Sequence, residues 1–153
     1  MKETYLKTDS VDEKETCLST LGSTNDPELV KECLDLFFSD QVTIQDVHNV
    51  AISLAANAKV RHLLWDYMKA NWGPVSAKLS SNNIVAERFV QAALVKFADH
   101  TVANDISSFF KDKDTGAYAR GLIIVNDNIL TNARYKERDE KLVLEWLETH
   151  EYV

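Results

Sequence analysis

The chain has 153 residues, of which 45% are hydrophobic and 27% are charged, and its formal net charge is −7. This balance is typical of one folded globular domain and excludes a disordered chain. The acidic charge and the lack of a basic run argue against nucleic-acid binding, which needs Lys and Arg against the phosphates. No apolar stretch approaches the roughly 20 residues of a membrane span, and the polar N-terminus has no signal-peptide core. We therefore expect a cytoplasmic protein without a membrane contact.

Long helices are expected along the whole chain, because only four Gly and two Pro interrupt it. Ser10 and Glu13 have the pattern of a capping box, and they predict a helix that Gly22 ends. Asp26 followed by Pro27 predicts the start of a second helix, which continues to about residue 38. The apolar face of this second helix has a 3.6-residue period and consists of Leu29, Val30, Cys33, Leu34, Phe37 and Phe38.

A third helix is predicted to open at Thr43, where Asp46 helps to cap its first turn. Asn57 is expected to cap a fourth helix, which Gly73-Pro74 breaks. Trp65 and Trp72 would then lie two turns apart on one face of this fourth helix, as core residues.

The rest of the chain also predicts helices and no strand. A short helical piece is expected after Pro74, followed by helices over about 83–97, 102–110, 117–135 and 138–149. The charged run 136–141 is read as a corner between the last two of these helices. In the last helix, the residues expected to face inward are Leu142, Val143, Trp146 and Leu147.

The predicted fold class is all-α, with antiparallel helix pairs joined by short connections. The pairs begin near Ser10, Thr43 and Asn82, which are spaced 33 and 39 residues apart. This spacing lies in the range of HEAT- and armadillo-like solenoids. The first pair has apolar residues but no polar terminal repeat before it. That fits a chain cut from a longer one, and a free-standing bundle could also bury these residues.

No arrangement of residues points to catalysis or metal binding in this chain. Zinc peptidases need two His at helical spacing with a Glu base between them. The four histidines, which are His48, His62, His100 and His150, do not pair at that spacing. His48 is interpreted as a core or rim histidine. Cys17 and Cys33 are interpreted as buried free thiols, and a disulfide between them is the alternative.

Five stretches, in order, resemble a known family. They are Asp12-Glu13-Lys14 to Leu21-Gly22 with Asp26-Pro27-Glu28-Leu29, then Val42-Thr43-Ile44-Gln45-Asp46, then Asn57-x7-Trp65-x-Tyr67-x3-Asn71-Trp72, then Ile106-x2-Phe109-Phe110, and finally Asn132-x2-Tyr135 with Trp146-Leu147. Together they resemble the C-terminal helical domain of the puromycin-sensitive and endoplasmic-reticulum aminopeptidases, and most of all the cytosolic alanine/arginine branch. The resemblance covers nearly the whole chain, 1–153.

Three positions depart from the family pattern. Val60 stands where the family often has Gly, so the local helix packing can differ. Thr43 stands where many members have a basic residue, which removes a partner for a peptide carboxylate. Tyr135 replaces Trp at an expected packing position.

The resemblance implies a non-catalytic role for this chain. Zinc and the catalytic residues would lie in an upstream catalytic domain of the same polypeptide, and no cofactor is expected in this chain. The domain would form the wall of a cavity that admits peptide substrates. Within it, Thr43, Gln45 and Asp46 are candidates for facing that cavity, and Asn57, Trp65, Tyr67, Asn71 and Trp72 form a structural motif. The alternative is a free-standing α-solenoid scaffold that binds a protein partner.

Overall fold

The computed structural model describes residues 1–152, and within this range every regular element is a helix, without a strand. The predicted all-α class is therefore confirmed for the described residues. The α-helices are α1 Lys2–Lys7, α2 Val11–Leu21, α3 Pro27–Phe37, α4 Val47–Ala56, α5 Arg61–Ala70, α6 Trp72–Leu79, α7 Asn83–Leu94, α8 His100–Phe110 and α9 Ala119–Thr149. A 3-10 turn, η1 Ile44–Asp46, precedes α4.

The helix-start signals at Ser10 and Asp26 correspond to real caps. The Ser10 hydroxyl accepts a hydrogen bond from the Glu13 amide at 3.4 Å, and Gly22 is the C-cap of α2. Asp26 accepts from the amide of Glu28 at 2.9 Å, with Pro27 in the first turn of α3. These bonds satisfy amides that a helix leaves unpaired at its start, so each helix begins where its cap is.

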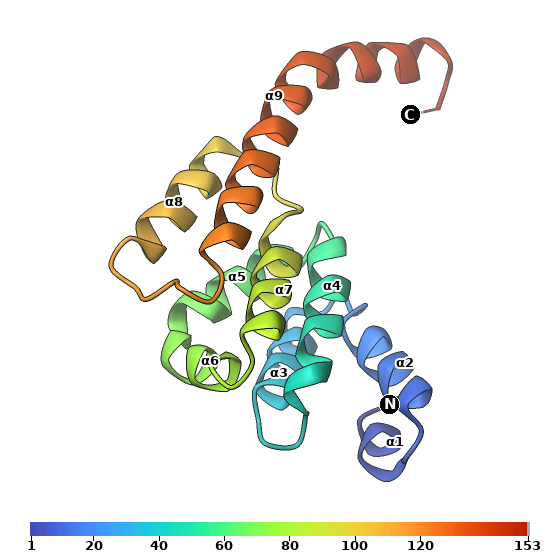
Figure 1. The fold of residues 1–153 in the computed structure, drawn as a ribbon. Coiled ribbons are helices and arrows are strands. Elements are labelled where there is room, and N and C mark those ends of the chain that lie inside the picture. Colours follow the sequence, from blue (N-terminus) through green and yellow to red (C-terminus); the bar gives the residue numbers. More distant parts are fainter. Residues whose placement is uncertain (153) are drawn as a thin grey trace.

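The helices stack so that those distant in sequence lie side by side (Figure 1). α4 packs between α2 and α7, and α7 packs in turn against α9. In addition, α3 contacts α5, and α8 contacts α9. One continuous core fills the space between these helices. Its largest fully buried side chains include Phe37, Phe89, Leu18, Leu34, Leu54, Leu64, Met68, Leu79, Leu94 and Ile129.

Several boundaries differ from the predictions. α1 is a short helix that the sequence pattern did not indicate. Asn57 does not open α5, because a turn separates the two and α5 begins at Arg61; Asn57 instead ends α4. Gly73-Pro74 does not break a helix, because both residues lie in the first turn of α6, where a missing amide proton costs nothing. The helix break comes at Asn71, so Trp72 belongs to α6 and the expected single helix carrying both tryptophans is wrong.

The C-terminal part of the chain departs furthest from the prediction. The two helices expected at 117–135 and 138–149 are one helix, α9, of 31 residues. The run 136–141 continues the helix instead of separating two helices. Figure 1 shows α9 bending along its length, so that its last part projects from the body. Leu142, Val143 and Trp146, expected to face inward, are 64%, 53% and 53% exposed, and Leu147 is only half-buried.

The remaining core predictions are largely right. Val30, Cys33, Leu34 and Phe37 are buried on α3, but Leu29 is 48% exposed and was wrongly placed on the buried face. Cys17 and Cys33 are both buried and both free, so the disulfide alternative is wrong. Burial raises the pKa of the Cys33 thiol above its ordinary value. Among residues 1–152, no helix has both the length and the apolar character needed to cross a membrane.

Candidate functional site

The turn before α4 holds the three residues that were expected to face a peptide cavity. Thr43 and Gln45 have exposed side chains, and Asp46 is half-buried. The Thr43 hydroxyl donates to Asp46 Oδ2 at 2.9 Å, and the Tyr5 hydroxyl donates to the same oxygen at 3.2 Å. Burial raises the pKa of Tyr5, and the nearby Asp46 carboxylate adds to this. The carboxylate of Asp46 therefore joins α1 to the start of α4.

These bonds correct the expected capping roles. No side chain caps η1 or α4, because the Asp46 carboxylate binds two hydroxyl groups instead of a backbone amide. Thr43 holds the turn with its hydroxyl and also with its backbone oxygen, which accepts from the Asp46 amide at 3.1 Å. Whether the exposed side chains of Thr43 and Gln45 face a substrate stays a prediction.

Asn57 connects two inter-helix links. Its amide nitrogen donates to Asn25 Oδ1 at 2.9 Å and to the Thr24 carbonyl at 3.3 Å, both in the α2–α3 link. Its side-chain oxygen accepts from the Lys59 amide at 3.1 Å, which shapes the turn before α5. A half-buried Asn that forms three bonds to neighbouring backbone and side chains has a structural role.

Tyr67 and Asn71 stabilise the C-terminal half of α5. The Tyr67 hydroxyl donates to Asp35 Oδ1 of α3 at 3.0 Å, and its ring stacks on Phe38 at a centroid distance of 5.6 Å. Burial, followed by the bond to Asp35, raises the pKa of Tyr67 to about 12. Asn71 donates to the Tyr67 carbonyl at 3.1 Å and ends the helix.

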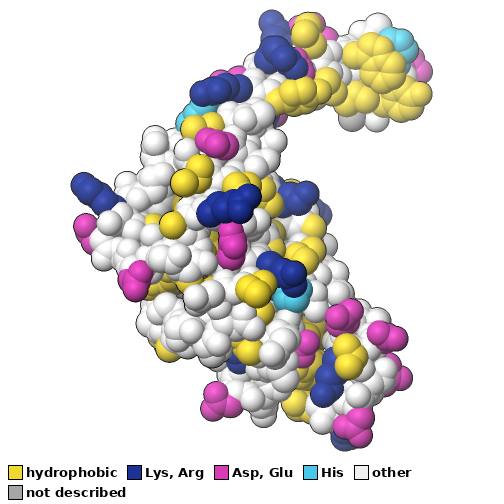
Figure 2. All heavy atoms as spheres, viewed as in Figure 1, with side chains coloured by type: hydrophobic (Ala, Val, Ile, Leu, Met, Phe, Trp, Pro, Cys, Tyr) yellow, Lys and Arg dark blue, Asp and Glu magenta, His cyan; other side chains and the backbone are white. Residues whose placement is uncertain are grey.

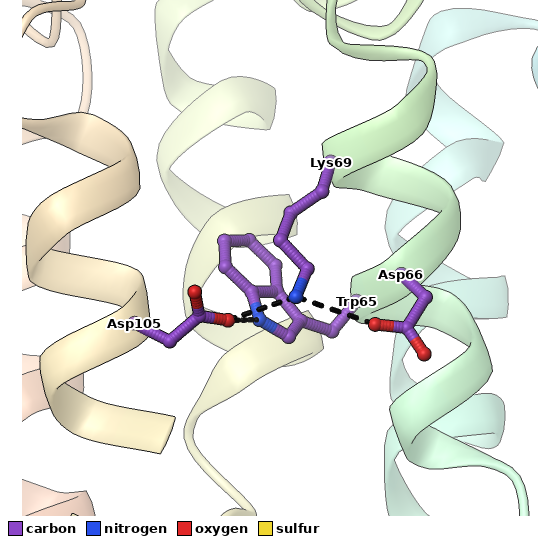
Figure 3. Close-up of polar contacts among 4 residues, drawn as sticks. All are labelled: Trp65, Asp66, Lys69 and Asp105. Atoms are coloured by element: carbon purple, nitrogen blue, oxygen red, sulfur yellow. Dashed lines mark hydrogen bonds and ion pairs between the residues drawn. The ribbon is translucent and has the colours of Figure 1, made fainter. Parts of the chain in front are cut away.

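Trp65 joins α5 to α8 through a shared carboxylate (Figure 3). The indole nitrogen of Trp65 donates to Asp105 Oδ2 at 2.8 Å, and the Lys69 ammonium donates to the same oxygen at 2.8 Å. Lys69 also forms an ion pair with Asp66 at 3.3 Å. The bonds from Lys69 and then Trp65 hold the pKa of Asp105 below its ordinary value. The same bond to Asp105 raises the pKa of Lys69, so this group stays charged.

An aromatic cluster surrounds this contact, and its members come from α5, α6, α8 and the link before α9. Trp65 meets Phe109 edge-to-face at 5.2 Å, and Trp72 meets Phe110 edge-to-face at 5.1 Å. Tyr118 closes the cluster at 5.8 Å from Phe110. Edge-to-face pairs contribute beyond the area they bury. The cluster brings the Trp65–Trp72 and Phe109–Phe110 motifs together in the fold.

A groove of about 570 Å³ lies beside this cluster. Trp72 and Tyr118 form its apolar part, and Ser76, Ser80 and Asn83 supply polar groups. The remaining lining residues are Ala77, Leu79, Ala86, Lys113, Asp114, Gly116 and Ala117. The Lys113 ammonium donates to the Phe109 carbonyl at 2.7 Å and lies 3.7 Å from the centroid of that ring. The sequence analysis missed this groove, because its lining comes from α6, α7 and an irregular link that carries no periodic signal.

The histidines and acidic residues give no metal centre within the described part of the chain. Among residues 1–152, no three His, Cys, Asp or Glu side chains come together as an ion site. His48 is half-buried, as expected of a rim position, and its Nδ1 has no hydrogen-bond partner.

Comparison with known proteins identifies the family. The sequence model of the family described as the ERAP1-like C-terminal domain matches residues 1–131. The chain is 31% identical to Aminopeptidase M1-C of Oryza sativa subsp. japonica over 87% of the chain and 15% of that protein. It is 27% identical to the alanine/arginine aminopeptidase of Saccharomyces cerevisiae over 94% of the chain and 17% of that protein. The chain thus spans about one sixth of the length of these relatives, and it belongs to the ERAP1-like C-terminal domain family of aminopeptidases.

Proposed function

We propose that this chain is the non-catalytic C-terminal part of a zinc-dependent aminopeptidase that removes N-terminal residues from peptides. The observation that carries the proposal is the match to proteins named aminopeptidases over most of the chain. Zinc and the catalytic groups would belong to an upstream domain of the same polypeptide. We place the enzyme in the cytoplasm, by analogy with the branch that the sequence resembles.

In this proposal the helical body forms part of the wall of the peptide cavity. The groove beside Trp72 and Tyr118 supports such a role, because it combines aromatic surface with hydroxyl and amide groups at neighbouring positions. Peptide-binding grooves use this combination, since apolar surface gives affinity and the polar groups give orientation. At the turn before α4, Thr43 and Gln45 would meet peptide with exposed side chains, and Asp46 would hold the turn in place.

Narrowing the groove in the full-length enzyme tests this proposal. Ala77 is exposed and lines the groove, so Ala77→Trp would fill the space without disturbing the core. We expect the KM for long peptides to rise several-fold, while turnover of a single-residue amide stays unchanged. Ala70→Trp is the matched control, because Ala70 is also exposed on a neighbouring helix but does not line the groove. If both variants have the same KM for long peptides, the groove is not part of the cavity wall.

The isolated chain gives a second readout. If catalysis belongs to an upstream domain, the purified 153-residue chain with added zinc should release no product from alanyl or arginyl amides. Turnover that survives repurification and disappears on chelation would contradict the non-catalytic assignment.

A further inference from the structure

The last part of α9, residues 134–149, has an apolar face that the body of the protein does not cover. We name this segment the arm. Within α9 the buried side chains end at Ala133. Beyond it, Tyr135, Leu142 and Trp146 are between 53% and 64% exposed. Figure 2 shows hydrophobic side chains gathered at the projecting end of the molecule. Several large apolar side chains exposed on one helical segment favour an interaction site.

The charges beside this apolar face are arranged in two blocks. Residues 134 to 141 include four basic and three acidic side chains. Residues 142 to 152 include three glutamates and no Lys or Arg. The charged residues at successive steps of four, three, four and three positions, which share one flank of a helix, are Arg134, Arg138, Lys141, Glu145 and Glu148. The flank therefore changes from positive to negative along its length.

The helix dipole does not account for the acidic end of the arm. Glutamates near the C-terminal end of a helix lie at the negative end of its dipole, where they are unfavourable. The last turn of α9 has no basic residue to compensate, and its first turn has no acidic one. Within the arm, Arg138 pairs with Asp139 and Lys141 pairs with Glu145 at 3.7 Å, but exposed pairs of this kind contribute little to stability, so the Arg138 and Glu145 side chains stay accessible to another surface.

We propose that the arm pairs antiparallel with the arm of a second copy of this chain. Antiparallel pairing places the acidic end of each arm against the basic part of the other, so the flank is complementary to itself. A two-fold axis between Lys141 and Leu142 sets Arg138 of each copy opposite Glu145 of the other. The apolar stripe beside the flank follows the same spacing, because Tyr135, Leu142 and Trp146 are separated by seven and four residues. A parallel pair would instead put like charges side by side.

The size of the arm sets the strength expected of this dimer. Sixteen helical residues extend over about 24 Å, so two arms bury less than the roughly 1,600 Å² of a standard interface. Association should therefore be weak and depend on concentration. Because the interface rests on a few charge pairs, reversing one of them should weaken it by about tenfold or more.

The test uses analytical ultracentrifugation of the purified chain over a concentration series. We expect the wild type to approach twice the monomer mass at high concentration. Arg138→Glu alone and Glu145→Arg alone each oppose like charges in a homodimer, and both should remain monomeric. Mixed together, the two variants should form a heterodimer, because each then meets the opposite charge at both contacts. This rescue on mixing is specific to the proposed register.

The controls separate pairing from misfolding and from general charge effects. Circular dichroism should give the same helical content for all variants. Arg120→Glu and Asp127→Arg reverse charges at the same spacing in the body part of α9, where both residues are exposed, and should leave the dimer intact. A wild type that stays monomeric at every concentration would overturn the proposal, and another segment of a longer polypeptide would then be the better candidate to cover the arm. The proposal would equally be overturned if Arg138→Glu and Glu145→Arg each dimerised as strongly as the wild type.

Discussion

Two tryptophan-bearing helical regions of this chain look alike in sequence and differ in the structure. Trp65 of α5 and Trp146 of α9 both lie among apolar residues at helical spacing, yet Trp65 is 4% exposed and Trp146 is 53% exposed. Around Trp65, α8 supplies the Asp105 carboxylate and the Phe109 ring. Trp146 stacks instead on rings of its own segment. Periodicity shows which face of a helix is apolar, but not whether the same chain covers that face.

The largest expected effect comes from truncating each tryptophan in turn. Trp65→Ala removes a buried ring, its hydrogen bond and its edge-to-face contacts, so we expect unfolding to become easier by about 3–5 kcal/mol. Trp146→Ala removes an exposed ring and should change the free energy of unfolding by no more than about 0.5 kcal/mol. Urea denaturation of dilute protein measures both. Similar losses for the two variants would break the comparison, since Trp146 would then be covered in solution.

Acid should weaken the bonds at Trp65. The pKa of Asp105 lies below its ordinary value of 3.8 because Lys69 and Trp65 bind the carboxylate. The Asp105 carboxylate therefore contributes its full share of stability above pH 3.8. This share is lost as the pH falls through the lower pKa that Asp105 has in the folded protein. The Asp105 side chain is 47% exposed, so solvent screening limits this contribution to about 1 kcal/mol at most.

Comparing the wild type with Asp105→Asn isolates this contribution. Asn keeps an acceptor for the indole of Trp65 but loses the charge that Lys69 meets. The gap in unfolding free energy between the two proteins should therefore be widest at neutral pH and close at strongly acidic pH. Asp127→Asn, a neutralisation at an exposed position of α9, is the control and should show no such convergence. A gap that is constant with pH would mean that the carboxylate charge does not stabilise the fold.

Local signals in the sequence predicted much of the fold correctly. Ser10, Asp26 and Gly22 set helix ends through bonds to nearby backbone, so neighbouring residues are enough to predict them. The break between α5 and α6 was misplaced for a related reason. Pro74 is a strong signal, but the first turn of a helix tolerates it, and the break depends on the Asn71 side chain reaching back to Tyr67.

The site was harder to predict than the helices because its residues meet across the chain. Trp65 and Asp105 are 40 positions apart, and Tyr5 and Asp46 are 41 apart, so no sequence pattern reveals either bond. The aromatic residues of two motifs, Trp65 with Trp72 and Phe109 with Phe110, contact one another in the structure. The groove beside Trp72, in contrast, forms where α6, α7 and the link to α9 leave space, and space between helices has no sequence signal.

Removing the whole arm should also have a small effect, and it is the sharpest test of the difference between body and arm. Ending the chain after Ala133 removes the whole arm but keeps every buried residue of α9. This truncation breaks the exposed ion pair between His100 and Glu137, whose atoms lie 3.3 Å apart, and exposed pairs contribute little to stability. We therefore expect the free energy of unfolding, measured by urea denaturation of dilute protein, to fall by less than about 1 kcal/mol. Ending the chain after Asp127 is the control, because it also removes the fully buried Ile129 and should cost about 2–5 kcal/mol. If the shorter and the longer truncation destabilise the protein alike, the arm packs on the body in solution, and the exposure of Trp146 no longer distinguishes the two regions.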